Sequence, residues 1–207
     1  MRKSTAGILC LCIASAVFAR PTTAPATSQE AATGAKNKDE VKMPLIFKGG
    51  YDTDPRDRGR PVVLIAAALK VPDEVFRETF THVKPAGPGS GGPTDAEARK
   101  NKAALMKGLA PYGVTDERLN EVSNFYRYSR GKGEMWRNAP AEGYATVRDG
   151  VVTGITITNA GYGYSSEPKV SVTGLEAVEL KSALAYGTDF KRNGSVQQIA
   201  VVAPAAK

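Results

Sequence analysis

The chain has 207 residues, of which 42% are hydrophobic, 24% are charged and 7% are aromatic. Lysine and arginine together number 28 against 21 acidic residues, and there are one histidine and two cysteines. This composition indicates a soluble protein with one ordinary domain or two small ones, and it excludes collagen-like, wholly disordered and multi-span membrane proteins. It also leaves little material for a transition-metal site built from side chains.

The N-terminus has the features of a secretory signal peptide. Arg2 and Lys3 precede an almost wholly apolar segment at 6–18, and Ala19 offers a small residue for cleavage. The apolar run is about 13 residues long, which is shorter than a transmembrane helix requires. We therefore expect residues 1–19 to be removed and the protein to be exported, periplasmic or secreted, with no stable membrane span. Retention of the segment as an anchor is the alternative.

Both cysteines lie inside this segment, so the exported protein is expected to have none. Cys10 and Cys12 each follow a leucine, whereas lipid attachment requires a small residue at that position. Loss of Arg2 and Lys3 lowers the formal net charge from +7 to +5. A modest positive charge outside the cytoplasm favours an anionic glycan or an envelope protein as partner, and no nucleic acid is expected. An ordinary solvated basic surface is the alternative.

Residues 20–42 are rich in alanine, threonine and proline and predict a disordered linker. Residues 43–140 predict a helical domain of four helices. The first follows Pro61 and is apolar on every face, the second starts near Pro72, the third follows a capping box at 94–97, and the fourth follows Thr115 and ends near Gly131. The apolar positions expected in their core are Phe76, Phe80, Val83, Leu105, Met106, Leu109, Leu119, Val122, Phe125 and Tyr126.

In residues 141–203 the apolar positions recur with a period of two, which is typical of β-strands. Asp149-Gly150 lies between apolar runs at 144–147 and 151–158 and predicts a tight hairpin, and Asn193-Gly194 predicts a second one between 189–192 and 195–202. Further strands are expected around 170–172 and 178–186. The predicted fold class is therefore α+β, with a small four-helix module followed by a small antiparallel β module, either a sheet or an open barrel of five or six strands.

Two segments resemble known families. Residues 149–174, DGVVTGITITNAGYGYSSEPKVSVTG, resemble the Gly-x-Gly-Tyr…Pro-x-Val β repeats of phage fibre and bacterial surface proteins, which implies a structural or adhesive role. The resemblance rests on Gly150, Ile155, Ile157, Gly161, Gly163, Tyr164, Pro168, Val170 and Val172. Residues 49–136, with DTDPRDRGRPVVLIAAAL and APYGVTDERLNEVSNFYRY, are similar to an uncharacterised group of exported bacterial proteins, and that similarity implies no activity.

The sequence does not single out a catalytic residue, a metal site or a cofactor. His82 has no cysteine or second histidine as a partner, and we interpret it as a residue exposed at a helix end. Asp52, Asp54 and Asp57 have oxygen ligands at short spacing that suit calcium, but Arg56 occupies a ligand position of the EF-hand pattern. Turn formation and helix capping are the favoured interpretation of these aspartates.

One segment combines aromatic and basic residues around the only tryptophan of the chain. The candidate binding residues are Tyr126, Arg127, Tyr128, Arg130, Lys132 and Trp136. Aromatic faces beside guanidinium groups suit stacking on sugars and pairing with anions. The alternative is a helix end with charge-compensating cations, in which Trp136 is an apolar plug between the two modules.

These features predict an exported binding or structural module of the cell envelope without catalytic activity. The alternative is a hydrolase or lyase that acts on an envelope polymer through carboxylates that the sequence does not identify. Such an enzyme would present two carboxyl groups roughly 5–9 Å apart in a cleft.

Overall fold

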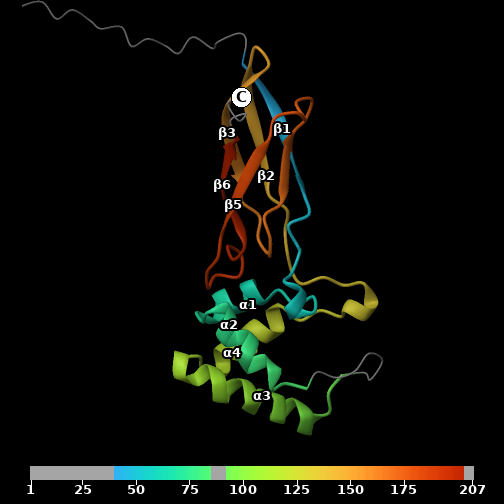
Figure 1. Ribbon diagram of the computed structural model, residues 1–207, viewed down its shortest axis with the longest axis vertical. Helices are drawn as coiled ribbons and strands as arrows, with labels where there is room; N and C mark the ends of the chain where they lie inside the picture. The colour runs from blue at the N-terminus through green and yellow to red at the C-terminus, as the bar shows by residue number, and fades with distance from the viewer. Residues whose placement is uncertain (1–39, 85–91, 203–207) are drawn as a thin grey trace, which may run out of the picture. The chain divides into compact units, whose positions relative to one another are not determined.

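The computed structural model describes residues 40–84 and 92–202, which belong to one compact unit. The predicted signal peptide and nearly all of the predicted linker lie outside the described residues. Within the described part the fold is mixed α+β, with four α-helices and one antiparallel sheet of six strands (Figure 1). None of the helices in this part has both the length and the apolar character needed to cross a bilayer.

The sheet has the strand order β3-β2-β1-β4-β5-β6, and every neighbouring pair is antiparallel. Its strands are β1 (Val41–Lys48), β2 (Glu142–Arg148), β3 (Val151–Asn159), β4 (Lys169–Val172), β5 (Leu180–Ala185) and β6 (Ser195–Val201). The outer strands β3 and β6 approach each other, and the amide of Val196 donates to the carbonyl of Ala160 at 2.9 Å. The sheet is therefore nearly closed into a barrel, and its interior is filled by apolar side chains.

The expected order of a helical module followed by a β module is not what the structure shows, because β1 precedes the helices. β1 pairs with β2 over Val41–Pro44 and with β4 over Leu45–Lys48, so it lies in the middle of the sheet. The segment alternates between exposed and partly buried positions and places Leu45 in the sheet core. A short run interrupted by Pro44 is a weak strand signal, since proline is uncommon inside a sheet.

The four helices are α1 (Val62–Leu69), α2 (Asp73–Thr81), α3 (Asp95–Leu109) and α4 (Asp116–Phe125). The prediction of a buried central helix is confirmed by α1, in which Leu64 and Ala66 are fully buried. The capping box is also confirmed, since the amide of Glu97 donates to Thr94 Oγ1 and the amide of Thr94 donates to Glu97 Oε2. The fourth helix ends at Phe125, several residues before the predicted end near Gly131.

The hairpin at Asp149-Gly150 is confirmed, and both residues have positive φ angles, as the turn requires. The second predicted hairpin is wrong in its first strand: residues 189–192 form a turn, and β6 pairs with β5 instead. The reason is the fully buried side chain of Asn193. Its Nδ2 donates to the carbonyl of Leu64 at 2.7 Å and to the hydroxyl of Tyr126 at 2.8 Å, which ties this turn to the helices.

The Gly-Tyr-Gly-Tyr segment at 161–164 joins the helical core to the sheet core. Tyr164 is 1% exposed, its hydroxyl accepts a hydrogen bond from the amide of Ala141, and its ring stacks on Tyr51 at 5.2 Å. Trp136 donates from Nε1 to the carbonyl of Gly163 at 2.8 Å. The motif that carries the resemblance to β repeats therefore supports the fold in this chain.

Candidate functional site

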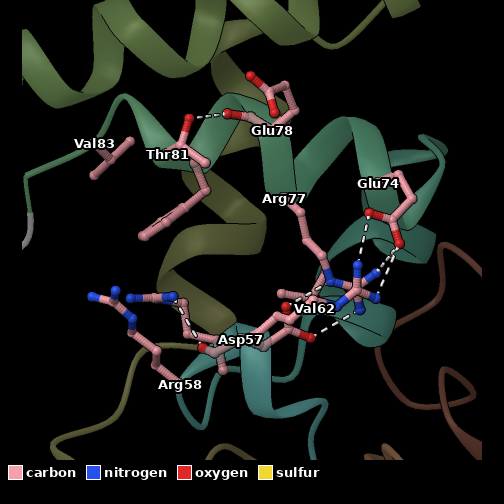
Figure 2. Close-up of a pocket in the computed structure, with 11 residues that line it drawn as sticks. Asp57, Arg58, Val62, Glu74, Arg77, Glu78, Thr81 and Val83 are labelled. Carbon is pink, nitrogen blue, oxygen red and sulfur yellow. Dashed lines mark hydrogen bonds and ion pairs between the residues drawn. The ribbon is translucent and has the colours of Figure 1, made fainter.

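The candidate site is a cavity of about 410 Å³ between α2 and the loop that connects β1 to α1 (Figure 2). We call it the arginine pocket. It is lined by Arg56, Asp57, Arg58, Arg60, Val62, Glu74, Arg77, Glu78, Phe80, Thr81 and Val83. Its volume falls within the range of small-molecule sites in proteins, roughly 300–1,000 Å³.

One side of the pocket is held together by ion pairs. Arg77 on α2 donates from Nε and Nη2 to the buried carboxylate of Asp57 at 2.7 and 2.9 Å, and from Nη1 to Glu74 at 2.8 Å. The hydrogen bonds to Asp57 are the main cause that raises the pKa of Arg77. These charges compensate one another, so this side of the pocket is structural.

Asp54 is bound by its neighbour Arg56. It caps the short 3-10 turn at Pro55–Asp57 by accepting from the amide of Arg56, and it also accepts from the guanidinium at 2.7–3.1 Å. These hydrogen bonds lower the pKa of Asp54 to about 2. Asp54 and Asp57 are thus engaged by arginines, and in residues 40–84 and 92–202 no acid, histidine or cysteine group is arranged to hold a metal ion.

The other side of the pocket carries Arg58 and Arg60, which have no carboxylate within 4.0 Å in the described part of the chain. Arg60 is half-buried, donates from Nη1 to the carbonyl of Asp57 and lies over the ring of Phe80 at 4.0 Å from its centroid. Burial is the main cause that lowers the pKa of Arg60, and the nearby charge of Arg58 also lowers it, whereas Tyr128 and Asp57 act in the opposite direction. Figure 2 shows Arg58 across the pocket from Glu74.

The loop that presents these arginines is supported by part of the predicted aromatic and basic segment. Arg130 donates from Nη1 to the carbonyl of Arg58 at 3.0 Å, and the hydroxyl of Tyr128 donates to the carbonyl of Gly59. Gly59 has a φ of +85°, and a Cβ atom at this position would collide with the guanidinium of Arg130. Arg58 itself has a φ of 50°, a conformation that non-glycine residues adopt at a cost.

The structure does not bring the six predicted binding residues together on one exposed surface. Tyr126 and Trp136 are both 4% exposed. Their polar atoms form hydrogen bonds inside the protein, Tyr126 with Asn193 and Trp136 with Gly163. Burial raises the pKa of Tyr126 to about 12. Tyr128 is half-buried and meets Trp136 edge-to-face at 5.6 Å between ring centroids.

Arg127, Arg130 and Lys132 are the exposed members of the predicted set. Of these, Arg130 is the one that contacts the loop of the arginine pocket. His82 lies at the end of α2 with its side chain 69% exposed, and its Nε2 is 4.0 Å from the carboxylate of Glu78. It lines the groove between α2 and α3 and does not line the arginine pocket.

Sequence reasoning missed Arg58, Arg60 and Phe80 as candidate site residues. The signal was present in the run Arg56-Asp57-Arg58-Gly59-Arg60, which has three arginines and one aspartate within five positions. Only the pairing of Asp57 with Arg77, which is twenty positions away, shows which of these arginines stay uncompensated. Comparison of the chain with protein-family models, curated proteins and solved structures found no match.

Proposed function

We propose that this protein is an exported, non-catalytic binding protein of the cell envelope whose arginine pocket takes an anionic group of its ligand. One observation carries the proposal: Arg58 and Arg60 lie near each other at the pocket without a carboxylate partner in the described residues. Arg56 and Arg77, on the other side, are engaged by Asp54, Asp57 and Glu74. The uncompensated positive charge is therefore confined to one wall.

Electrostatics supports an anion as the occupant of this wall. A half-buried guanidinium has lost part of its hydration, and a second guanidinium nearby raises its energy further. An anion bound between the two would remove both unfavourable effects, and the planar guanidinium is well suited to carboxylate and phosphate oxygens. The signal-like N-terminus supports a location where anionic glycans and lipids are accessible.

The proposal is tested by isothermal titration calorimetry at low ionic strength with an oligogalacturonate, glucose 6-phosphate and a neutral oligosaccharide as probes. We expect binding of the charged probes that weakens as salt is added, and no binding of the neutral one. Replacing Arg58 and Arg60 together by glutamine should reduce the affinity more than tenfold. The matched control is the Arg99→Gln/Lys100→Gln variant, which removes two exposed cations from α3 and should bind normally.

Two outcomes would contradict the assignment of the site. Equal losses of affinity in the Arg58/Arg60 and Arg99/Lys100 double variants would mean that binding depends only on the total charge of the protein. Loss in an Arg127→Gln/Lys132→Gln variant, with full binding in the Arg58/Arg60 variant, would place the site in the predicted aromatic and basic segment.

The alternative of an envelope-polymer hydrolase or lyase would draw on the carboxylates of the same pocket. Asp57 and Glu74 line it, but both accept hydrogen bonds from Arg77, which favours a structural role. Release of reducing ends from an envelope polysaccharide that is abolished in a folded Glu74→Gln variant would favour the enzyme. The adhesive role implied by the β-repeat resemblance is compatible with a binding protein.

A further inference from the structure

We infer that the anionic group is a phosphate monoester in its dianionic form, held between Arg58 and Arg60 with its organic part against the apolar side of the arginine pocket. This inference rests on the proposed function and names the ligand class for the same site. It is carried by the number of uncompensated charges, by the free hydrogen-bond donors and by the size of the cavity.

The charges of the two arginines match a dianion. Arg58 and Arg60 both lack a carboxylate within 4.0 Å in the described residues, whereas the carboxylate of Asp57, the residue directly before Arg58, is turned to Arg77. A single carboxylate would leave one of the two guanidinium groups uncompensated. A phosphate monoester carries nearly two negative charges at neutral pH.

The available donors also exceed what one carboxylate uses. Arg60 donates a hydrogen bond from Nη1 to the carbonyl of Asp57. In the described part of the chain, no hydrogen bond is donated by Nε or Nη2 of Arg60 or by the guanidinium of Arg58. Each planar guanidinium group can donate a pair of parallel hydrogen bonds. A phosphate monoester has three terminal oxygens and can accept hydrogen bonds from both guanidinium groups at once. A carboxylate has two oxygens and is suited to one guanidinium group.

The cavity has room for more than an inorganic ion. Its volume of about 410 Å³ is that of a small-molecule site, and Val62, Phe80 and Val83 form its apolar lining. The ring of Phe80 is covered by Arg60, which keeps that guanidinium at the pocket. We therefore expect an organic phosphate to bind more tightly than inorganic phosphate.

The loop is held in its binding geometry before a ligand arrives. The amide of Arg58 donates to the carbonyl of Pro55, its own carbonyl accepts from Arg130, and the carbonyl of Gly59 accepts from Tyr128. Arg130 and Tyr128 are positioning residues in this arrangement, because they bond to the loop backbone. Preorganisation of this kind raises affinity by reducing the ordering that binding requires.

The test compares phenyl phosphate with benzoate, phenyl sulfate and inorganic phosphate by calorimetry at pH 7.5 and pH 5.0. We expect phenyl phosphate to bind about tenfold more tightly than the two organic monoanions at pH 7.5. Its affinity should fall about tenfold at pH 5.0, because the second phosphate pKa is about 6 and the dianion becomes the minor form. Benzoate and phenyl sulfate stay ionised, so their affinities should change little.

The protein's own titrating groups require a control. The other charged or titratable groups that face the site are Arg56, Asp57, Glu74, Arg77, Glu78, Arg130 and the phenol of Tyr128. His82, the single histidine of the chain, lies outside the arginine pocket. The His82→Asn variant must therefore keep the pH dependence. Arg58→Gln and Arg60→Gln should each lower the affinity for phenyl phosphate about tenfold, whereas Arg99→Gln should not.

A lipid and a soluble compound are both sources of phosphate monoesters, and a vesicle assay distinguishes them. Stronger binding to vesicles that contain phosphatidic acid than to vesicles that contain phosphatidylglycerol identifies a lipid source. Of these two lipids, only phosphatidic acid carries a phosphate monoester. Binding of phenyl phosphate without vesicle binding identifies a soluble source. Equal affinities for benzoate and phenyl phosphate, or no change with pH, would overturn the inference and leave the proposed function standing. Failure of every anion to bind would overturn the proposed function itself.

Discussion

The buried carboxylate of Asp57 accepts two hydrogen bonds from the guanidinium of Arg77, at 2.7 Å from Nε and 2.9 Å from Nη2. Asp57 comes from the loop after β1 and Arg77 from the middle of α2, so this pair fastens the loop to the helix. Their side chains are 4% and 17% exposed. The pair forms one wall of the arginine pocket and leaves Arg58 and Arg60 on the other.

Replacing Asp57 by asparagine should lower the free energy of unfolding by about 3 kcal/mol. It leaves the part-buried Arg77 with Asp54, at 3.9 Å, and the exposed Glu74 as its remaining counter-ions. Urea unfolding of Asp57→Asn, Arg77→Met and the double variant measures the coupling between the two side chains. Glu121→Gln removes one partner of the more exposed pair with Arg118 and should cost less than about 1 kcal/mol. Similar losses for Asp57→Asn and Glu121→Gln would contradict a structural role for the buried pair.

Replacing Asn193 by alanine should destabilise the protein by about 2–3 kcal/mol. The substitution leaves the carbonyl of Leu64 and the buried hydroxyl of Tyr126 without the donor that joins them to the sheet, and the amide of Gly187 without its acceptor. Thermal and urea unfolding measure the effect. The control Asn124→Ala changes an exposed residue of α4 and should shift the stability by less than about 0.5 kcal/mol. Equal effects of the two substitutions would show that the buried amide is not a link between helices and sheet.

Replacing Gly59 by alanine should weaken anion binding as well as stability. Gly59 and Gly133 have φ angles of +85° and +74°, so alanine at either position should cost about 1 kcal/mol of stability. A Cβ atom at Gly59 would also collide with the Arg130 guanidinium, whereas one at Gly133 would meet nothing within 4 Å. Calorimetry with phenyl phosphate should therefore show a loss of affinity for Gly59→Ala and none for Gly133→Ala. Unchanged binding by a folded Gly59→Ala variant would mean that Arg130 does not position the loop.

The carboxyl of Asp54 should titrate well below an ordinary aspartate. Hydrogen bonds from Arg56 lower its pKa from 3.8 to about 2 in the folded protein. Because the folded pKa is depressed, the stabilisation is present above about pH 4 and is lost as the pH falls towards 2. An NMR titration of the side-chain carboxyl carbon checks the value. The Arg56→Gln variant should return the pKa towards that of a free aspartate, and an unchanged low value would contradict Arg56 as the cause.

The local features of this chain could be predicted from the sequence because near neighbours determine them. The apolar run after Pro61 indicates a buried helix, Thr94 and Glu97 form a capping box, and Asp149-Gly150 forms a tight turn. Each depends on residues within a few positions of one another, through capping, periodicity and turn geometry. The mixed α+β class and the antiparallel pairing of the strands follow from these local signals, and the structure bears both out.

Long-range contacts decided the rest, since no local rule states which strands pair or which side chains meet. β1 lies between β2 and β4, and Asn193 is a buried link because Leu64 and Tyr126 lie against it in the fold. The candidate site depends on the same kind of contact. The sequence shows a run of arginines near aspartates, and only the tertiary pairing of Asp57 with Arg77 leaves Arg58 and Arg60 as the uncompensated charges of a pocket. Charge neutralisation acts through distances in space, which the order of residues alone does not determine.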